Sequence, residues 1–457
     1  MLKPTIFREY DIRGVADAEL PGDDVALLGQ ALGTYLRRHG GPKLCLGRDT
    51  RLSSTRLRDA LMRGLIASGC QVTDIGVEPT PLLYYATVHT KADGGVMITG
   101  SHNPPEFNGF KTVLGTGTIH GEAIQEIRRM IETGDLDRGA GSEQAADVVT
   151  PYVDEVAAQF HFPRRIRVVV DAGNGVGGPV AHRLFERLNV DVEEMFFEMD
   201  GRFPNHHPDP TVPRYLEALI ARVLETKADL GIAFDGDADR LGAVDERGAI
   251  LWGDQLMVLY AREILARKPG ATFIGEVKCS QLMYDDIAAH GGHPIMWKTG
   301  HSLIKAKMKE TGAALAGEMS GHMFFADRYH GYDDAIYAAC RLIEIVARSG
   351  RPLSTHLADL PRTVTTPEIR FDCPDEIKFD VVSRAAGELR SCHKTVEVDG
   401  VRVLFEEGWG LVRASNTQPV LVMRFEARTP ELLGRYRGEV ESVVERAKVE
   451  TERAGGR

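Results

Sequence analysis

In the middle of the chain the sequence reads Leu230-Gly231-Ile232-Ala233-Phe234-Asp235-Gly236-Asp237-Ala238-Asp239-Arg240. The apolar residues 230–234 predict a buried strand, and the aspartates at alternate positions predict a polar loop at its carboxyl end. A strand followed by a polar loop occurs twice more, at Gly95–Pro104 and at Ala313–His322. In open α/β sheets, ligands bind beyond the carboxyl ends of the strands. Three such loops in three similar units therefore predict one shared cleft.

An internal repeat accounts for this similarity. Each unit has a strand, a polar or glycine-rich loop, a helix and a second strand, at Lys43–Ile75, Arg167–Phe197 and Thr272–Trp297. Strands that alternate with helices predict parallel or mixed sheets covered on both faces. The C-terminal segment differs, because Asp399-Gly400 between two apolar runs is a hairpin signal. The segment is therefore expected to hold antiparallel strands and a closing helix.

A chain of 457 residues is too long for one hydrophobic core, so several domains are expected. Gly134–Ala146 reads as a linker, and Pro361–Pro367 separates the repeats from the C-terminal segment. The expected domains are residues 1–147, 148–249, 250–361 and 367–457. Each of the first three holds one polar loop.

The composition excludes several classes of protein. Hydrophobic residues make up 43% and charged residues 26%, as in a globular protein. No apolar run approaches the roughly 20 residues needed to span a bilayer, and no apolar signal core follows Met1. The net charge of −11 argues against a nucleic-acid or membrane partner, but not against a small anionic substrate. Six scattered cysteines without a C-x-x-C pair predict a reducing compartment, the cytoplasm.

The acidic loop is interpreted as a metal site. Asp235, Asp237 and Asp239 repel one another unless a cation neutralises them, and hard oxygen ligands select Mg²⁺ or Ca²⁺. An EF-hand is excluded, since Arg240 occupies the position that needs glycine. A phosphatase with an aspartyl nucleophile also ends a strand with D-x-D, but Asp239 replaces its usual threonine. The remaining alternative is a solvated acidic loop.

The other loops carry groups suited to phosphate and sugar. Asn103 precedes a proline, which predicts that Ser101 stands on a constrained, exposed turn. Glu318, Ser320 and His322 at alternate positions can hold sugar hydroxyls. The fourth loop, between two C-terminal strands, suits a phosphate monoester through Arg413, Ser415, Asn416 and Thr417. Each loop taken alone also fits an ordinary turn.

Taken together, the four loops resemble the α-D-phosphohexomutase superfamily, and within it the bacterial phosphomannomutase/phosphoglucomutase group. The resemblance runs from Phe7–Gly14 and Gly47–Arg51 to Arg413–Ala427. It implies an α/β fold of three similar mixed-sheet α/β domains plus a smaller C-terminal α+β domain around a central cleft. It also implies a phosphohexomutase, an intramolecular phosphotransferase that interconverts hexose 1-phosphate and hexose 6-phosphate. An enzyme phosphoserine and a hexose 1,6-bisphosphate, as intermediate and activator, would carry the phosphoryl group.

The resemblance also assigns residues. Ser101 is the phosphoserine, and it binds Mg²⁺ together with Asp235, Asp237 and Asp239. The implied catalytic residues are Ser101, His102, Lys111, Arg240 and His322, with Lys111 and His322 as open alternatives for base and acid. The implied substrate contacts are Tyr10, Arg13, Lys278, His301, Glu318, Ser320, Arg413, Ser415, Asn416 and Thr417. Gly100 and Met319 favour glucose or mannose phosphate over glucosamine phosphate. A monomer or weak homodimer is expected.

Simple electrostatics supports a cation at this site. A phosphoserine carries about −1.5 to −2 charges, and each unit pair of like charges 4 Å apart repels by about 4 kcal/mol at an effective dielectric of 20.

Two alternative functions remain. A metal-dependent phosphatase would release inorganic phosphate without storing it on Ser101, and a Ca²⁺- or sugar-binding module would need no nucleophile. The fourth domain, tethered through Thr363–Thr366, is expected to close over the substrate.

Overall fold

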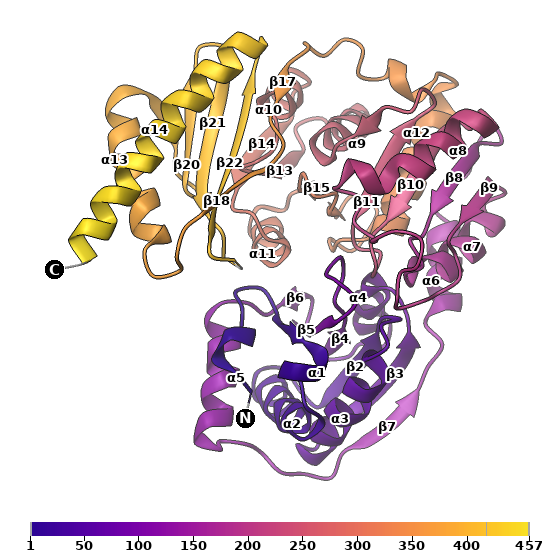
Figure 1. Ribbon diagram of the computed structural model, residues 1–457. Coiled ribbons are helices and arrows are strands. Elements are labelled where there is room, and N and C mark those ends of the chain that lie inside the picture. The colour runs from indigo at the N-terminus through magenta and orange to yellow at the C-terminus, as the bar shows by residue number, and fades with distance from the viewer. Residues whose placement is uncertain (1, 417, 456–457) are drawn as a thin grey trace.

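The structure, a computed structural model, describes residues 2–416 and 418–455. In these residues the strands form four sheets, one in each of four successive parts of the chain, with helices packed around them (Figure 1). We call these parts domains 1 to 4. No helix in the described residues has the length and apolar character needed to cross a membrane.

Domain 1 is built on a mixed sheet in the order β1-β5-β4-β2-β3-β7, with β6 beside β5. Its strands are β1 (Ile12–Val15), β2 (Lys43–Arg48), β3 (Gln71–Val77), β4 (Gly94–Ile98), β5 (Phe107–Leu114), β6 (Gly117–Thr118) and β7 (Ser142–Ala145). Its helices are α1 (Ala16–Glu19), α2 (Gly22–His39), α3 (Ser54–Ala67), α4 (Thr80–His89) and α5 (Glu122–Thr133), after the short 3₁₀ turn η1 (Pro4–Ile6).

Domains 2 and 3 have smaller mixed sheets, in the orders β12-β11-β10-β8-β9 and β14-β13-β15-β16. The strands are β8 (Arg167–Asp171), β9 (Asp191–Met195), β10 (Leu230–Phe234), β11 (Leu241–Asp245), β12 (Ile250–Leu251), β13 (Thr272–Glu276), β14 (His293–Trp297), β15 (Leu315–Gly317) and β16 (Met323–Phe325). The helices are α6 (Val149–Ala157), α7 (Gly177–Arg187), η2 (Pro213–Leu216), α8 (Glu217–Thr226), α9 (Gly253–Arg267), α10 (Gln281–Ala289), α11 (His301–Thr311), α12 (Ala335–Ser349) and η3 (Leu353–Thr355).

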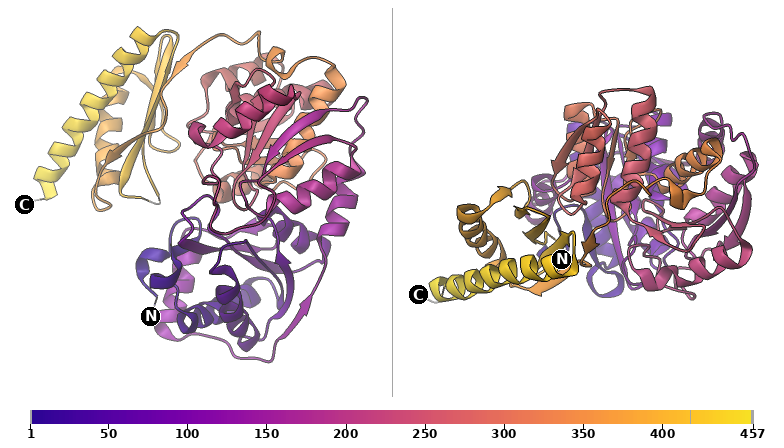
Figure 2. Two further views of the ribbon diagram at one scale, coloured as in Figure 1. Left: turned by 45° about the vertical axis from the view of Figure 1, so that its right-hand side comes forward. Right: turned by 90° about the horizontal axis from the view of Figure 1, so that it is seen from above.

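Domain 4 is an antiparallel sheet, in the order β17-β22-β21-β20-β19 with β18 beside β22. Its strands are β17 (Val364–Thr365), β18 (Ile369–Asp372), β19 (Lys394–Val396), β20 (Val401–Phe405), β21 (Gly408–Ala414) and β22 (Val420–Ala427), and its helices are α13 (Lys378–Cys392) and α14 (Pro430–Gly455). Figure 2 shows α13 and α14 at one side of the molecule, away from domains 2 and 3. The predicted hairpin is confirmed, since β19 and β20 pair across Asp399-Gly400.

The three α/β sheets share one local design, which confirms the predicted repeat. In each of them a parallel strand turns back into an antiparallel neighbour, β4 into β5, β10 into β11 and β15 into β16. The three polar loops are these turns. All residues of β4, β10 and β15 are buried, as expected for strands covered on both faces.

Alternate residues of the central strands point into different cores. Cys45 in β2, Val168 in β8 and Phe273 in β13 belong to one hydrophobic core that domains 1, 2 and 3 share. Their chain neighbours face separate clusters beneath the outer helices of each domain, as Leu44 does in domain 1. Domains 1 to 3 therefore form one body held by buried apolar surface.

Domain 4 has a core of its own, between its sheet and α13 and α14. It meets domain 3 at a small cluster of Val277, Trp409 and Leu411. There the Arg402 guanidinium lies over the Trp409 ring, 3.8 Å from its centre, and donates to the carbonyl oxygens of Val277 and Cys279 at 2.8 and 2.7 Å. We call this contact, Arg402 and Trp409 against Val277 and Cys279, the domain 3–4 joint.

Three short strands lie outside the expected elements. β7 pairs with β3 within the segment expected to be a linker, so residues 142–145 belong to the first sheet. β12 pairs with β11, which carries the second sheet past the expected boundary at residue 249. β17 pairs with β22, so the expected tether is part of the sheet of domain 4. β7 is fully exposed and β17 partly so, and such short strands carry little apolar pattern.

Candidate active site

Ser101 lies at the turn from β4 to β5 and points at the acidic loop of domain 2. Its Oγ donates a hydrogen bond to Asp235 Oδ2 at 2.7 Å. Its φ of 49° is in the left-handed region, which confirms a constrained turn. The prediction of an exposed turn is wrong, because Ser101 is only 3% exposed. The loop of domain 2 covers it: a Cβ on Gly236 would lie 2.5 Å from the Ser101 carbonyl oxygen.

Asp49 and Arg51, from the loop after β2, hold the Ser101 turn in place. Arg51 Nη2 donates to the carbonyl oxygens of Ser101 and Asn103 at 2.8 and 2.6 Å. Asp49 Oδ2 accepts the backbone N–H of Gly100 at 3.0 Å and the Arg51 Nε–H at 3.1 Å. A Cβ at position 100 would clash with the Arg51 guanidinium. An alanine at position 100 would therefore have to displace the Arg51 guanidinium. The roles of Asp49 and Arg51 were not predicted, although both residues lie in the Gly47–Arg51 motif.

The three aspartates and Lys111 form a buried charged cluster. Asp235, Asp237 and Asp239 each offer an oxygen within 4.8 Å of the others, and all three are fully buried. Lys111 Nζ donates to Asp237 Oδ2 at 2.8 Å and to Asp239 Oδ2 at 2.5 Å. Asp235 Oδ1 accepts the backbone N–H groups of Asp239 and Arg240, so its other oxygen faces Ser101. We call Ser101, Lys111 and the three aspartates the reacting cluster.

This cluster suits a hard divalent cation. Asp237 Oδ1 and Asp239 Oδ1 are buried and have no hydrogen-bond partner among the described residues. Burial, together with the charges of Asp237 and Asp239, raises the pKa of Asp235 well above its ordinary value. Burial lowers the pKa of Lys111, but its two carboxylate partners outweigh that effect and raise it. Lys111 alone thus leaves carboxylate charge uncompensated, and oxygen ligands of this kind fit Mg²⁺.

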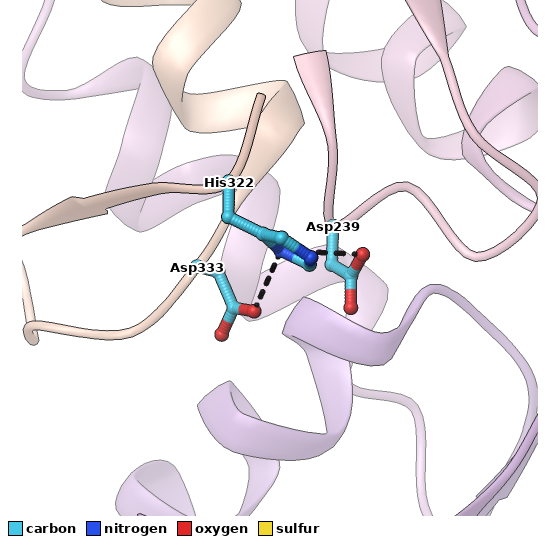
Figure 3. A group of neighbouring side chains, drawn as sticks. All are labelled: Asp239, His322 and Asp333. Atoms are coloured by element: carbon cyan, nitrogen blue, oxygen red, sulfur yellow. Dashed lines mark ion pairs between the residues drawn. The ribbon is translucent and has the colours of Figure 1, made fainter. Parts of the chain in front are cut away.

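Arg240 and His322 extend the cluster toward domain 3. Their backbones form a β-bridge, and Arg240 Nε donates to His322 Nε2 at 3.0 Å. The other ring nitrogen, Nδ1, lies 3.0 Å from Asp333 Oδ2 and 3.5 Å from Asp239 Oδ1. Figure 3 shows the His322 ring between these two carboxylates. Asp333, just before α12, was not predicted; nothing in its local sequence signals this contact.

His102 lies beside the reacting cluster. Its Nδ1 is 3.1 Å from Asp209 Oδ2, and its carbonyl oxygen contacts the His207 ring. Burial and the nearby Arg240 charge lower the pKa of His102 to about 3, although Asp209 opposes this shift. His102 is therefore neutral at physiological pH.

The domain 3 residues lie next to this group. Glu318 Oε1 accepts the backbone N–H of Gly300 at 2.7 Å, and its Oε2 accepts the Ser320 hydroxyl at 3.1 Å. The His301 ring stacks on His322 with 5.8 Å between centroids, and it meets the edge of Tyr10 at 6.3 Å. Rings from domains 1 and 3 thus connect the reacting cluster to the part of the site that domain 4 approaches.

Domain 4 brings to the same place residues 413–416, which the sequence predicts to bind phosphate and which we call the phosphate loop. Arg413 Nε donates to Asp399 Oδ2 at 2.9 Å, and Ser415 Oγ accepts the backbone N–H of Gln418 at 3.2 Å. Asn416 Nδ2 donates to the Tyr10 hydroxyl at 2.6 Å. Thr417 lies outside the described residues.

Tyr10 links three domains. Besides accepting from Asn416, its hydroxyl donates to the Thr299 carbonyl oxygen at 2.9 Å. Burial raises the pKa of Tyr10 to about 12, so it stays a neutral donor. Arg13 pairs with Asp11, and Lys278 Nζ is 3.3 Å from Glu368 Oε2, at the border of domains 3 and 4. The structure therefore places the predicted residues in or around two groups, the reacting cluster and the phosphate loop.

Comparison with known proteins agrees with this arrangement. Residues 4–138, 150–248 and 252–364 match the models of phosphoglucomutase/phosphomannomutase alpha/beta/alpha domains I, II and III. Residues 368–443 match the C-terminal domain of the same family. The chain belongs to the phosphoglucomutase/phosphomannomutase family.

Members of this family match along nearly the whole chain. The phosphomannomutase/phosphoglucomutase of Pseudomonas aeruginosa is 46% identical over 437 residues, covering 95% of this chain and 94% of that protein. The phosphoglucomutase of Neisseria gonorrhoeae is 44% identical over 445 residues, covering 96% of each chain. A crystal structure of a family protein from Burkholderia thailandensis superposes with a TM-score of 0.92 at 42% identity, covering 98% of both chains. The predicted family and fold class are confirmed.

Proposed function

We propose that this phosphoglucomutase/phosphomannomutase family member interconverts hexose 1-phosphates and hexose 6-phosphates of glucose and mannose. The observation that carries the proposal is the 2.7 Å hydrogen bond from Ser101 Oγ to Asp235 in a buried cluster of three aspartates. Neighbours in that family act, by their names, on phosphoglucose and phosphomannose. A serine at this point can carry a phosphoryl group against a metal-binding loop.

The reaction consists of two phosphoryl transfers. In the first, the bond between phosphorus and Ser101 Oγ breaks, a bond from phosphorus to the free sugar hydroxyl forms, and that hydroxyl loses its proton. The product is a hexose 1,6-bisphosphate. After this intermediate turns over, its other phosphoryl group returns to Ser101. Phosphoryl transfer depends mainly on positioning and charge stabilisation.

The residues of the reacting cluster divide these tasks. Two carboxylates hold the Lys111 ammonium group in place. We assign this group to donate a hydrogen bond to the oxygens of the transferring phosphoryl group. We assign His322 to accept the proton of the sugar hydroxyl, a step in which its Nε2 exchanges the hydrogen bond that it accepts from Arg240 Nε for that proton. A Mg²⁺ ion held by Asp235, Asp237, Asp239 and a Ser101 phosphate oxygen would draw charge off the phosphoryl group.

The phosphate loop holds the phosphate that does not react. Arg413 offers a guanidinium that can take a phosphate by two hydrogen bonds, and its charge lies close enough to Lys278 to oppose the rise in the pKa of that lysine. Ser415 and Asn416 add polar groups on the same loop, and the sequence predicts the same of Thr417, while we assign Glu318, Ser320 and His301 to contact the sugar. One loop can therefore grip either the 1-phosphate or the 6-phosphate.

We also place the enzyme in the cytoplasm, since all six cysteines are free thiols.

The proposal is tested by intact mass and by turnover. The purified protein is expected to carry one phosphoryl group that is absent from Ser101→Ala, and this variant should lose mutase activity. Ser391→Ala, at the exposed end of α13, is the matched control. A coupled assay with glucose, mannose and glucosamine 1-phosphates then compares the sugars. Steady release of inorganic phosphate, or full activity in Ser101→Ala, would contradict the proposal.

A further inference from the structure

We infer that Thr80 is a positioning residue that orients the carboxylate of Asp237, so that Asp237 Oδ1 is kept for a divalent cation. The inference rests on the proposed function, in which Asp237 helps to hold Mg²⁺. Thr80 is the first residue of α4 in domain 1, whereas Asp237 follows β10 in domain 2. One domain therefore sets the geometry of a metal ligand that another domain carries.

Thr80 contacts Asp237 through two hydrogen bonds. Its backbone N–H donates to the Asp237 carbonyl oxygen at 3.0 Å, and its Oγ1 donates to Asp237 Oδ2 at 2.6 Å. A carboxylate oxygen accepts and does not donate, so the single hydroxyl proton of Thr80 is committed to this oxygen. Both residues are fully buried, so bulk water does not compete for the bond. The backbone contact fixes where the loop lies, and the side-chain contact fixes how the carboxylate is turned.

The other donors to the Asp237 carboxylate act on the same oxygen. Thr99 Oγ1 donates to Oδ2 at 3.1 Å, and Lys111 Nζ donates to it at 2.8 Å. Each carboxylate oxygen offers about two lone pairs, so three donors saturate Oδ2. Asp237 Oδ1 is buried and has no hydrogen-bond partner in the part of the chain that the structure describes. The carboxylate therefore presents one oxygen to the protein and leaves the other for a cation.

Thr80 is the donor whose replacement isolates this effect. Lys111 also bonds Asp239, and Thr99 also accepts the Ser101 backbone N–H at 2.9 Å, so replacing either residue changes a second contact. Thr80→Val keeps the side-chain shape and the backbone N–H, and it replaces the hydroxyl by a methyl group. Asp237 then keeps two donors but loses the bond from α4. In metal sites, groups that hold a ligand in this way change metal affinity by about 10- to 100-fold.

Binding of Mn²⁺ alone tests the inference, because carboxylates also bind this ion and electron paramagnetic resonance measures its unbound fraction. The measurement uses the full chain without phosphate on Ser101, as intact mass shows, and the site is identified by the binding that Asp237→Asn loses. We expect Thr80→Val to raise the Kd for Mn²⁺ by at least about tenfold. Thr80→Ser keeps a hydroxyl and should stay within about threefold of the unaltered chain.

Thr87→Val is the matched control. Thr87 is also buried in α4, and its hydroxyl donates to the Tyr84 carbonyl oxygen at 2.7 Å, so this variant loses a hydrogen bond of the same helix. Its Kd for Mn²⁺ should stay within about threefold of the unaltered chain. An equal rise of the Kd in Thr87→Val or in Thr80→Ser would overturn the inference, because the hydroxyl at position 80 would then not be the cause.

Turnover gives a second readout that a merely structural role would not change. In Thr80→Val the Mg²⁺ concentration for half-maximal turnover should rise by at least about tenfold, and kcat at saturating Mg²⁺ should stay within about threefold of the unaltered enzyme. A loss of kcat that saturating Mg²⁺ does not restore, with an unchanged Kd for Mn²⁺, would overturn the inference. An unchanged Kd in folded Thr80→Val would overturn it as well.

Two further outcomes keep the inference separate from folding and from the proposed function. If Thr80→Val fails to fold, as a melting curve would show, Thr80→Ala takes its place and has to show the rise that Thr80→Ser does not. If the unaltered chain binds Mn²⁺ but shows no mutase turnover, the proposed function fails, and the Kd values still decide the role of Thr80. If it binds no Mn²⁺ that Asp237→Asn loses, the inference itself fails.

Discussion

The reacting cluster and the phosphate loop are connected through Tyr10, His301 and His322, but they are built in different ways. Ser101, Lys111 and the three aspartates are 0–3% exposed and belong to domains 1 and 2, which share a hydrophobic core with domain 3. The phosphate loop belongs to domain 4, which has a core of its own and meets the other domains through the domain 3–4 joint, Tyr10 and polar pairs such as Lys278–Glu368 and Ser280–Glu426.

This difference matches the two tasks of the site. Transfer of a phosphoryl group needs fixed geometry, which a shared core provides. Gripping a phosphate on either end of the sugar needs a part that can adjust, and a separately cored domain can move as a unit. Changes in the reacting cluster are therefore expected to lower kcat, whereas changes in the phosphate loop should raise KM.

The largest effect is expected for Asp239→Asn. This substitution removes one charge from the cluster that is proposed to bind Mg²⁺, and it leaves Lys111 with one carboxylate partner. We expect kcat to fall by about 10³-fold with KM changed less than about threefold. Steady-state kinetics over a range of Mg²⁺ concentrations measure both. Asp285→Asn, on the exposed side of α10, is the control. Equal losses in kcat and in substrate affinity would argue against a catalytic metal.

Arg51→Lys should have the next largest effect. Lysine cannot reach the carbonyl oxygens of Ser101 and Asn103 together, so the Ser101 turn loses its support. We expect kcat to fall by about 10²-fold and the free energy of unfolding by about 2 kcal/mol. Gly100→Ala should act in the same direction by displacing Arg51. Kinetics and urea unfolding test both variants against Arg63→Lys on the exposed face of α3. Unchanged kcat in both would remove the positioning role.

Arg413→Gln should affect the phosphate loop and not the reacting cluster. Loss of a charged contact to phosphate is expected to raise KM by about 10- to 100-fold and to change kcat by less than about fivefold. The rise should be equal for glucose 1-phosphate and glucose 6-phosphate, because one loop grips both. Arg390→Gln, exposed on α13, is the control. A rise for only one substrate would show that the two phosphates are held at different places.

The smallest effect is expected for Tyr10→Phe. The variant loses the hydroxyl that joins domain 1 to Thr299 and to Asn416, one neutral hydrogen bond on each side. We expect KM to rise by about threefold, and amide exchange to become faster around residues 299 and 416. Unaltered exchange at both segments would mean that Tyr10 does not hold domain 4.

Local sequence was enough to predict the loops that carry the chemistry. A buried strand followed by clustered polar residues marked Asp235–Arg240, Ser101 and Glu318–His322, and the hairpin turn marked Asp399-Gly400. Each of these signals spans about ten residues or fewer, so residue propensities and the hydrophobic pattern are enough to predict it. The repeat then predicted that the loops would converge, as the Ser101–Asp235 hydrogen bond shows.

Roles that depend on distant contacts were not predicted. Asp333 meets His322 only after β16 and the following loop have folded back, and Arg51 reaches Ser101 from the loop after β2. The burial of Ser101 depends on domain 2 packing over domain 1. The edge strands β7 and β17 are too short and too exposed to leave an apolar pattern. Such features arise from tertiary packing, which a single sequence does not display.

The domain 3–4 joint sets how far the phosphate loop can travel. The Arg402 guanidinium lies between an indole ring and two backbone carbonyl oxygens, which hold it in place. We expect domain 4 to turn about this contact when the substrate binds, so that the distance from the joint to the phosphate loop stays constant. A sugar bound in either orientation would then have its non-reacting phosphate held at the same distance from Ser101.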